Sequence, residues 1–391
     1  MNSILFSFAL LLVTIPLSIK ACSPDSTYLG QPPPGRIPEI FAPGIISLDN
    51  RFETYPTFSP DGNELYFSVV NASWTRGKIL HTRDIDGVWT AVDTAAFSNN
   101  NYINWESFIS PDGNRQFFTS NRPPSASTDI WVVERVSDSS WSNPVQMNTP
   151  VNSGSIDGSA CITNNGSIYF KSLRGGGAGG SILYRSPLIN GAYSEVENLG
   201  DIIPTGPGES EPFMAPDESY LIFISETRTP GMGGWDLWIS FRKQDSSWSD
   251  PANMGADINT TDDEYGPRVT IDGKYLFFTR EKPGSTMDIY WVSSGIIDSL
   301  KGLLLSTPPS PIEHNIQIDP NPVLDYLKIH FGTGLYKKAN IRMVNLAGKT
   351  ILSNSFLDPV EVGIDLSWYP KGIYLLVLEV DGEILTKKIV Y

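Results

Sequence analysis

The chain has 391 residues, enough for two or three domains, and its 34 glycines, 30 prolines and 11% aromatic residues favour a turn-rich all-β protein. Its formal net charge of −15 disfavours nucleic acid and anionic membrane surfaces as partners, because both repel acidic proteins. The charge is compatible with cations, basic proteins and neutral glycans, and it also favours solubility.

The N-terminus has the pattern of a signal peptide. The apolar run from Ile4 to Ile19 has the length of a signal-peptide core and is short for a membrane span, although no basic residue precedes it. Ala21 suits an ordinary signal peptidase, whereas Cys22 would be the lipidated residue of a lipoprotein site, a pattern that Lys20 fits poorly. We therefore expect a signal peptide over residues 1–21 and an exported mature chain without a transmembrane span, with lipoprotein anchoring at Cys22 as the alternative.

A tight polar turn then recurs along the chain, first as Ser59-Pro60-Asp61-Gly62 in "PTFSPDGNELYF". The turn residues that align are Asp61, Asp112, Asn165, Asp217 and Asp272, which lie 51, 53, 52 and 55 residues apart. A sustained period near 50 residues indicates a propeller or a solenoid.

Each repeat has the same four parts. One strand ends at the turn, an apolar-aromatic strand such as "ELYFSVV" follows it, and a third strand such as "DIWVVER" comes after a loop of Gly, Ser or Pro. The fourth strand is expected to open near an aromatic residue, namely Trp89, Trp141, Tyr193 or Trp248. Four short antiparallel strands in each repeat make one propeller blade.

The fifth repeat lacks its own fourth strand, because the chain runs from "DIYWVSSGIIDSLKG" into "STPPSP". Residues 39–47, "EIFAPGIIS", resemble the other fourth strands and precede the first turn. We expect them to complete the last blade, since closing the ring removes an open sheet edge. The sequence thus predicts a five-bladed β-propeller over residues 39–300.

The repeated "SPDG" turn followed by an apolar strand resembles the TolB-type, WD-like propeller repeat family. The resemblance covers five units and about 260 residues. The third and fourth units show departures from the motif. The third has Asn164-Asn165 in place of Pro-Asp, a mild change because Asn tolerates positive φ, and the fourth has Glu218 in place of Gly.

Residues 301–314 have the Pro and Ser content of an extended linker, and the pattern changes from residue 315. Alternating segments around Pro320-Asn321-Pro322, Ala347-Gly348 and Asp381-Gly382 predict β-hairpins. Residues 315–391 are therefore expected to form a small, Ig-like β-sandwich.

This tail resembles the C-terminal sorting domain of the type IX secretion system. The residues that carry the resemblance are Pro320-Asn321-Pro322, "NLAGKTI", Lys371-Gly372-Ile373-Tyr374 and the terminal "KKIV". It implies passage across the outer membrane by the type IX machinery, removal of the tail by a sortase, and either release or attachment at the cell surface. An ordinary carbohydrate-binding or adhesion sandwich is the alternative.

Propellers bind ligands at the channel mouth, on loops held by rigid strands. The residues eight positions before each turn residue are expected to ring one mouth, and they are Glu53, Asn104, Asp157, Glu209 and Glu264. Glu106 and Glu211 add further charge. Such carboxylates suit a hard cation such as Ca²⁺ or an acid/base pair, but acidic residues at strand starts also cap turns or pair with arginine in a purely structural role.

Other features have mainly structural explanations. Two sets of residues are expected to pair and hold the blade loops, and they are Asp129, Asp236 and Asp288 with Arg122, Arg174 and Arg228. Cys161 is expected to be a small buried hydrophobe, and no Cys or His cluster has the spacing of metal ligands. Trp74, Trp105 and Trp235 lie near predicted loops, where they either stack on sugar rings or pack between blades.

Two classes of function remain. The first is an exported, non-enzymatic propeller that binds a glycan, a peptide or a protein partner at the cell surface, and we favour it because no catalytic motif such as G-x-S-x-G is present. The alternative is a glycan-active hydrolase or lyase that uses carboxylates at the channel mouth, by analogy with other five-bladed propellers.

Overall fold

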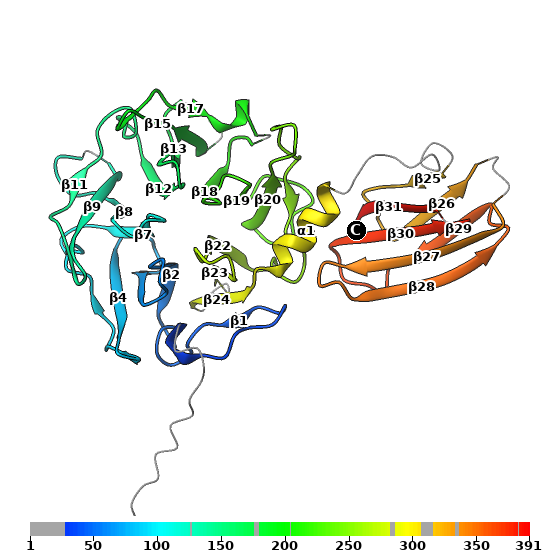
Figure 1. Ribbon diagram of the computed structural model, residues 1–391, viewed down its shortest axis with the longest axis horizontal. Helices are drawn as coiled ribbons and strands as arrows, with labels where there is room; N and C mark the ends of the chain where they lie inside the picture. Colours follow the sequence, from blue (N-terminus) through cyan, green and yellow to red (C-terminus); the bar gives the residue numbers. More distant parts are fainter. Residues whose placement is uncertain are drawn as a thin grey trace, which may run out of the picture.

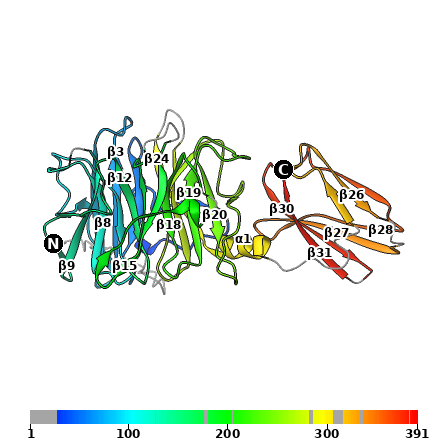
Figure 2. The same ribbon diagram turned by 90° about the horizontal axis from the view of Figure 1, so that it is seen from above.

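The computed structural model describes residues 28–391 except 126, 176–179, 204, 282–285, 306–315, 333–335 and 382. The expected signal peptide, Cys22 and most of the expected linker lie outside the described residues. Figure 1 shows a ring of small sheets followed by a separate sandwich, with the helix α1 (Gly295–Leu305) between them. Figure 2 shows the same order from above. None of the helices in the described part of the chain has the length and apolar character needed to cross a membrane.

The ring is a five-bladed propeller in which each blade places its first strand innermost (Figure 1). The first blade comprises β2 (Phe52–Phe58), β3 (Glu64–Val70), β4 (Gly77–Ile85) and β6 (Asp93–Thr94). The second comprises β7 (Asn104–Ile109), β8 (Arg115–Ser120), β9 (Asp129–Ser137) and β11 (Val145–Gln146). The third comprises β12 (Asp157–Ile162), β13 (Ile168–Ser172), β14 (Ile182–Ser186) and β17 (Glu197–Asn198). The fourth comprises β18 (Glu209–Met214), β19 (Tyr220–Ser225), β20 (Asp236–Phe241) and β21 (Ala252–Asn253).

The fifth blade takes β22 (Asp263–Val269), β23 (Tyr275–Glu281) and β24 (Met287–Ser293) from the end of the propeller, and its fourth strand is β1 (Glu39–Ile40). Glu39 pairs with Trp291 and Ile40 with Tyr290 in an antiparallel register. The next residue, Phe41, is fully buried, with its ring 5.2 Å from that of Trp291. The predicted closure of the ring by the N-terminal strand is therefore confirmed.

The fourth strands differ in position from the expectation. Each begins four residues after the aromatic residue that was expected to open it. Trp89 and Trp141 lie instead in short hairpins with the end of the third strand, as Trp89 does in β5 (Val88–Trp89), paired with Asp84. Tyr193 and Trp248 pair with residues just after that strand. The hairpin turns the chain back before the outer strand begins.

Every innermost strand contains a β-bulge at the same place. The register with the second strand shifts between Thr54 and Thr57 in β2, and between Trp105 and Phe108 in β7. The equivalent bulge residue has a φ of 50° to 58° in all five blades, and these residues are Tyr55, Glu106, Ser159, Glu211 and Gly266. A bulge re-aims a side chain. It also ends the two-residue alternation along the strand.

The tail forms a β-sandwich of two sheets, as predicted. One sheet has the order β25 (Ile316–Asp319), β26 (Tyr326–Phe331), β29 (Glu361–Asp365). The other has the order β28 (Thr350–Leu357), β27 (Lys338–Asn345), β30 (Ile373–Val380), β31 (Glu383–Val390). Leu346 and Ile373 of the tail also pack into the hydrophobic core of the propeller.

The helix α1 occupies residues that were expected to belong to the propeller end and to the linker. Ile296, Ile297 and Leu300 are buried in the propeller core, and Leu303 and Leu304 pack against it. This spacing is that of one helical face. Residues 301–305 of the predicted linker are thus helical.

Candidate functional site

The five residues expected to ring the channel mouth hold equivalent positions in the five blades, but they are buried inside the blades. Glu53, Asn104, Asp157, Glu209 and Glu264 are each 0 or 1% exposed. An arginine of the same blade contacts each of them. The contacts are Arg51 to Glu53, Arg122 to Asn104 at 2.5 Å, Arg174 to Asp157 at 2.9 Å, Arg228 to Glu209 at 2.5 Å, and Arg280 to Glu264 at 2.8 Å.

These arginines also hold the chain that enters the blade. Arg51 donates to the carbonyl oxygen of Ile46 at 2.6 Å, and Arg280 donates to that of Ile258 at 2.8 Å. Arg122 and Arg174 likewise donate to loop carbonyl oxygens, so in four of the blades the guanidinium group fastens the incoming loop to the innermost strand. The arrangement supports the structural role that was the alternative for this ring, while ligand binding by these residues stays a prediction.

Among the residues that the structure describes, Asp129 and Asp236, at the start of the third strand, do not pair with arginine, so the expected pairing is wrong for both. Asp129 accepts hydrogen bonds from Ser125 at 2.5 Å and Gln146 at 2.6 Å. Asp236 accepts from the backbone N–H groups of Met232 at 2.5 Å and Gly233 at 3.2 Å. These aspartates cap their own loops, and the arginines pair with the first strand instead.

The channel itself is lined two residues further along each innermost strand. The bulge residues Tyr55, Glu106 and Glu211 reach a pocket of about 470 Å³ at the channel mouth, to which all five blades contribute. The walls of this channel-mouth pocket include Trp74, Trp105, Trp235, Tyr265, Ile156 and Leu173. Its floor is formed by Glu106, Lys171 and Glu211.

A hydrogen-bonded network orders one half of the floor around Glu106. Its Oε1 accepts from Lys171 Nζ at 2.6 Å, and its Oε2 accepts from Thr119 Oγ1 at 2.5 Å and from the Ser159 backbone N–H at 2.7 Å. Burial alone would raise the pKa of Glu106, but the Lys171 ammonium group and these hydrogen bonds outweigh it and lower the pKa below its usual value. Glu106 is therefore an ionised carboxylate.

Glu211 forms the other half of the floor in a different environment. Its Oε1 accepts from the Tyr55 hydroxyl group and its Oε2 from the Gly266 backbone N–H, both at 2.6 Å. Burial raises the pKa of Glu211, with Lys171 opposing the rise and the charge of Glu106 adding to it. The two floor carboxylates thus have pKa values shifted in opposite directions.

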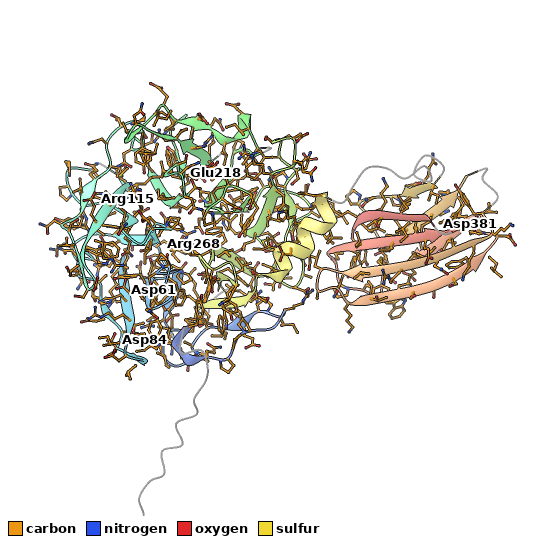
Figure 3. The ribbon with its side chains drawn as sticks, in the orientation of Figure 1. Asp61, Asp84, Arg115, Glu218, Arg268 and Asp381 are labelled. Atoms are coloured by element: carbon orange, nitrogen blue, oxygen red, sulfur yellow. The ribbon has the colours of Figure 1, made fainter. Side chains whose placement is uncertain are left out.

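The next residue on each strand that faces inward closes the channel below this floor. These residues are Thr57, Phe108, Cys161, Phe213 and Arg268, and each is at most 6% exposed. The Arg268 guanidinium group lies over the Phe108 ring at 5.4 Å, and Figure 3 shows Arg268 near the centre of the ring of blades. Cys161 is buried as expected, and burial raises the pKa of its thiol to about 11.

Trp74 covers one side of the pocket from the loop between β3 and β4. Its ring packs edge-on against Trp105 at 6.0 Å, Tyr265 at 5.8 Å and Tyr55 at 6.4 Å. Asn71 holds the loop, because its side chain accepts from the backbone N–H groups of Thr75 and Arg76 and donates to two hydroxyl groups. The aromatic wall is therefore built on an ordered loop.

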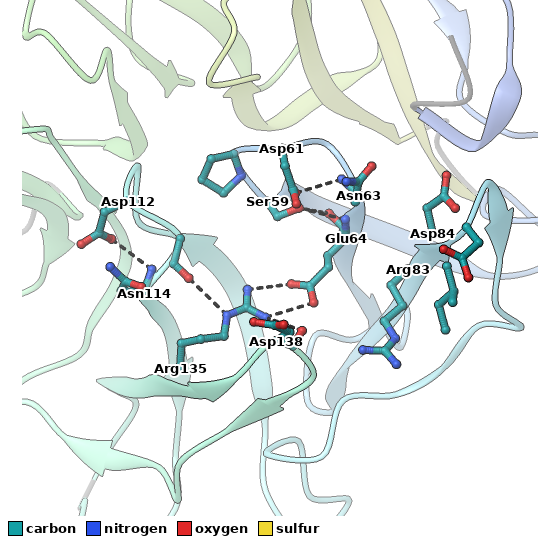
Figure 4. Close-up of a pocket in the computed structure, with 14 residues that line it drawn as sticks. Ser59, Asp61, Asn63, Glu64, Arg83, Asp84, Asp112, Asn114, Arg135 and Asp138 are labelled. Atoms are coloured by element: carbon teal, nitrogen blue, oxygen red, sulfur yellow. Dashed lines mark hydrogen bonds and ion pairs between the residues drawn. The ribbon is translucent and has the colours of Figure 1, made fainter. Parts of the chain in front are cut away.

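The opposite face of the propeller carries the "SPDG" turns and a different hollow (Figure 4). Asp61 Oδ1 accepts from the Ser59 hydroxyl group and from the Asn63 backbone N–H, so it forms the turn as expected. Arg135 of the second blade donates to both carboxylate oxygens of Glu64 in the first, at 3.0 and 2.7 Å (Figure 4). This hollow of about 630 Å³ is bounded by contacts that join two blades.

Sequence reasoning placed the ring two residues too early, because it took the residues at the start of each innermost strand, whereas the side chains that reach the pocket stand at the bulge. A usable signal was proline inside three of the innermost strands, at Pro56, Pro212 and Pro267, each directly after the bulge residue. Proline within a sheet is confined to edges and bulges. Across the described residues, no group of three or more His, Cys, Asp or Glu side chains is placed to hold a metal ion.

Comparison with known proteins identifies the tail. Residues 317–391 match the model of the secretion system C-terminal sorting domain. No curated protein matches the chain. Among solved structures, the chain is similar to a protein assigned as TolB from Agrobacterium tumefaciens, with 14% identity, a TM-score of 0.40, and coverage of 87% of this chain and 91% of that one.

Two enzymes are also among the similar structures. An endo-arabinase from Bacteroides thetaiotaomicron is 13% identical, with a TM-score of 0.42 and coverage of 66% of this chain and 96% of that one. An α-L-arabinofuranosidase from Podospora anserina is 11% identical, with a TM-score of 0.40 and coverage of 68% and 98%.

Proposed function

We propose that this secreted propeller, which carries a C-terminal sorting domain, binds a glycan in the channel-mouth pocket. The observation that carries the proposal is the pairing of an aromatic wall with a charged floor in a pocket of about 470 Å³. Ligand pockets of this size typically combine apolar walls with a few convergent polar groups. The binding is non-enzymatic in this proposal.

A sugar suits this combination better than a peptide does. A pyranose ring presents one face of C–H groups, which packs on an indole ring such as that of Trp74 or Trp105. Its hydroxyl groups both donate and accept, so they can meet the ionised Glu106 and the ammonium group of Lys171 at once. If the test below finds binding to a peptide library and to no glycan, a peptide or protein is the ligand instead.

The tail supports both the secretion route and the site of action in this proposal. Its match to a secretion sorting domain supports delivery by the type IX machinery, removal of the tail by a sortase, and a site of action at the cell surface or in the medium. An accessible polysaccharide is a ligand that such a location provides.

The test is calorimetric titration of residues 22–391, with the sorting domain retained, with a panel of neutral and acidic oligosaccharides. We expect saturable binding, and we expect Trp74→Ala to weaken it by roughly tenfold or more because stacked aromatic residues dominate such contacts. Trp368→Ala is the matched control, since Trp368 is 85% exposed on the sandwich and lies outside the pocket. Equal loss in both variants, or binding of a peptide library but of no glycan, would sink the proposal.

A hydrolase or lyase is the second candidate, and the oppositely shifted pKa values of Glu106 and Glu211 favour it. In such a pair the carboxyl group with the raised pKa, Glu211, would donate a proton to the leaving oxygen, and the ionised Glu106 would act as base or nucleophile. Reducing ends released by the wild type and lost in Glu211→Gln, with binding retained, would establish hydrolysis. Unchanged glycans after prolonged incubation would leave binding as the function.

Calcium at the ring of Glu53, Asn104, Asp157, Glu209 and Glu264 is a separate proposal. One oxygen, Glu53 Oε2, has no hydrogen-bond partner among the described residues, which supports a further ligand there. A calcium-dependent rise in the unfolding midpoint would support the proposal. A midpoint that millimolar calcium leaves unchanged would remove it.

A further inference from the structure

A second hollow lies on the same face as the channel-mouth pocket, between the first and second blades. It has a volume of about 590 Å³ and is lined by the end of β3, the start of β4, the loop at residues 100–103 and Asn121. We call it the inter-blade groove. Its lining contains Arg76 and Lys78 but no aspartate or glutamate. This is unusual in a chain with 43 acidic and 28 basic residues.

The groove presents mainly hydrogen-bond donors. Within the described residues, neither the Arg76 guanidinium group nor the Lys78 ammonium group forms an ion pair. Asn121 uses its carbonyl oxygen to accept from the Ile103 backbone N–H at 2.7 Å, which leaves its NH₂ group for a ligand. The side chains of Asn100 and Asn101 are exposed beside it. A donor-rich groove fits a ligand rich in acceptors.

The charge of the groove contrasts with that of the opposite face. At the other end of β3, the hollow of Figure 4 is lined by Asp61, Glu64, Asp84, Asp86, Asp112 and Asp138, with Arg83 and Arg135 as its cations. The acidic side chains at this junction of blades thus gather at one end of the strands and the free cations at the other. The two faces differ in the sign of charge that they accept.

The loop at residues 71–76 separates the groove from the channel-mouth pocket. Trp74 faces the pocket, whereas Asn71 and Thr75 line the groove. Gly77 and Trp105 also touch at this boundary, since a Cβ atom on Gly77 would lie 2.9 Å from the Trp105 ring. A chain molecule that enters the pocket can therefore continue over one short loop into the groove.

We infer that the inter-blade groove binds an anionic sugar unit, one that carries a carboxylate or sulfate group, of the same glycan that the pocket holds. The inference rests on the proposed function and names the class of its ligand, an acidic polysaccharide. Arg76 and Lys78 would contact the anionic group, and the asparagine amides would contact neighbouring oxygens.

The net charge of −15 does not prevent such binding at close range. Charges more than about 8 Å apart are largely screened at physiological ionic strength, so the groove's own cations decide the contact. Specificity would come from short-range charge-assisted hydrogen bonds.

The experiment compares matched ligands on residues 22–391, with the sorting domain retained, by titration calorimetry. Oligogalacturonides are compared with their carboxyl-reduced counterparts, and sulfated galactan oligomers with their desulfated forms. We expect the anionic member of at least one pair to bind roughly tenfold to a hundredfold more tightly. The double variant Arg76→Gln/Lys78→Gln is expected to abolish that preference while still binding the neutral member.

The control variant is Arg83→Gln/Lys243→Gln, which also removes two positive charges but from the face that carries the turns. It should keep the preference. If the wild type binds neutral and anionic members equally, or if the groove variant keeps the preference, the inference is overturned and the proposed function stands. If no glycan of either kind binds, the proposed function falls and the inference falls with it.

Discussion

Tyr55 of the first blade donates a hydrogen bond to Glu211 of the fourth blade across the channel, with 2.6 Å between the hydroxyl oxygen and Oε1. The two residues are 156 positions apart in the chain and hold the same bulge position in their blades. Both belong to the floor and walls of one pocket. The floor is therefore a product of ring closure, and the predictions below test its parts.

Tyr55→Phe should lower the free energy of unfolding by about 1–2 kcal/mol, because it leaves a buried carboxyl group with one partner fewer. It should also raise the pKa of Glu211 further, because in the wild type the hydrogen bond from the Tyr55 hydroxyl group lowers that pKa and so opposes the effect of burial. Urea unfolding at several pH values measures both. Tyr326→Phe, at a tyrosine that is 50% exposed on the sandwich, is the control and should be neutral.

Lys171→Met should destabilise the protein by about 3 kcal/mol at pH 7, because it leaves the buried Glu106 charge without its 2.6 Å partner. Without Lys171, burial would raise the pKa of Glu106 in the folded state above its value in the unfolded state. The loss of unfolding free energy relative to wild type should therefore grow as the pH rises through the unfolded-state pKa. Unfolding curves at pH 4 and pH 7 test this. The double variant Lys171→Met/Glu106→Gln removes the unpaired charge and should recover part of the lost stability. A double variant as unstable as Lys171→Met would argue against the ion pair as the cause.

Glu264 sets a pH dependence that can be isolated by substitution. Burial raises its pKa to about 7, against the opposing effect of Arg280. A folded-state pKa above the unfolded value of 4.5 means that the folded state binds the proton more tightly, so this group's contribution to stability falls from pH 4.5 to pH 7 and is constant above. The difference in unfolding free energy between wild type and Glu264→Gln should follow that curve. A difference that does not vary between pH 4.5 and pH 7 would contradict it.

Phe41→Ala should cost about 3–5 kcal/mol, because it opens a cavity where the N-terminal segment seals the last blade. Phe41 is fully buried and its ring lies 5.1 Å from that of Phe277. Ile37→Ala is the neighbouring control, since Ile37 is 74% exposed and should change stability by less than about 0.5 kcal/mol. Equal, small effects of the two changes would show that closure contributes little.

Asn71→Ala should weaken glycan binding by roughly tenfold while leaving global unfolding nearly unchanged, because it frees the loop that carries Trp74. Asn71→Asp keeps an acceptor for the Thr75 and Arg76 N–H groups and should lose less affinity. Affinity is measured by the same titration as for Trp74→Ala. An Asn71→Asp variant that binds as poorly as Asn71→Ala would argue against the loop's role.

The architecture was predictable because it repeats. Five turn residues spaced by 51 to 55 positions indicate five similar units, and the missing fourth strand of the last unit points to residues 39–47. Pairing of Glu39 with Trp291 confirms that step. The hairpins of the tail were equally readable from their alternation, as the pairing of β30 with β31 illustrates.

The sequence by itself determined the blades, their number, the closure and the sorting domain, because each depends on local pattern and on repetition. Only the tertiary structure decided which side chains meet in the channel, since the residues that reach the pocket, such as Tyr55 and Glu211, stand at the bulge of each innermost strand and not at its start, where Glu53 and Glu209 lie. It likewise decided that the arginines bind the first strand and that Lys171 neutralises Glu106. The arginine contacts form within single blades, whereas the contacts of Lys171 with Glu106 and of Tyr55 with Glu211 join different blades, so their geometry exists only once the blades have assembled.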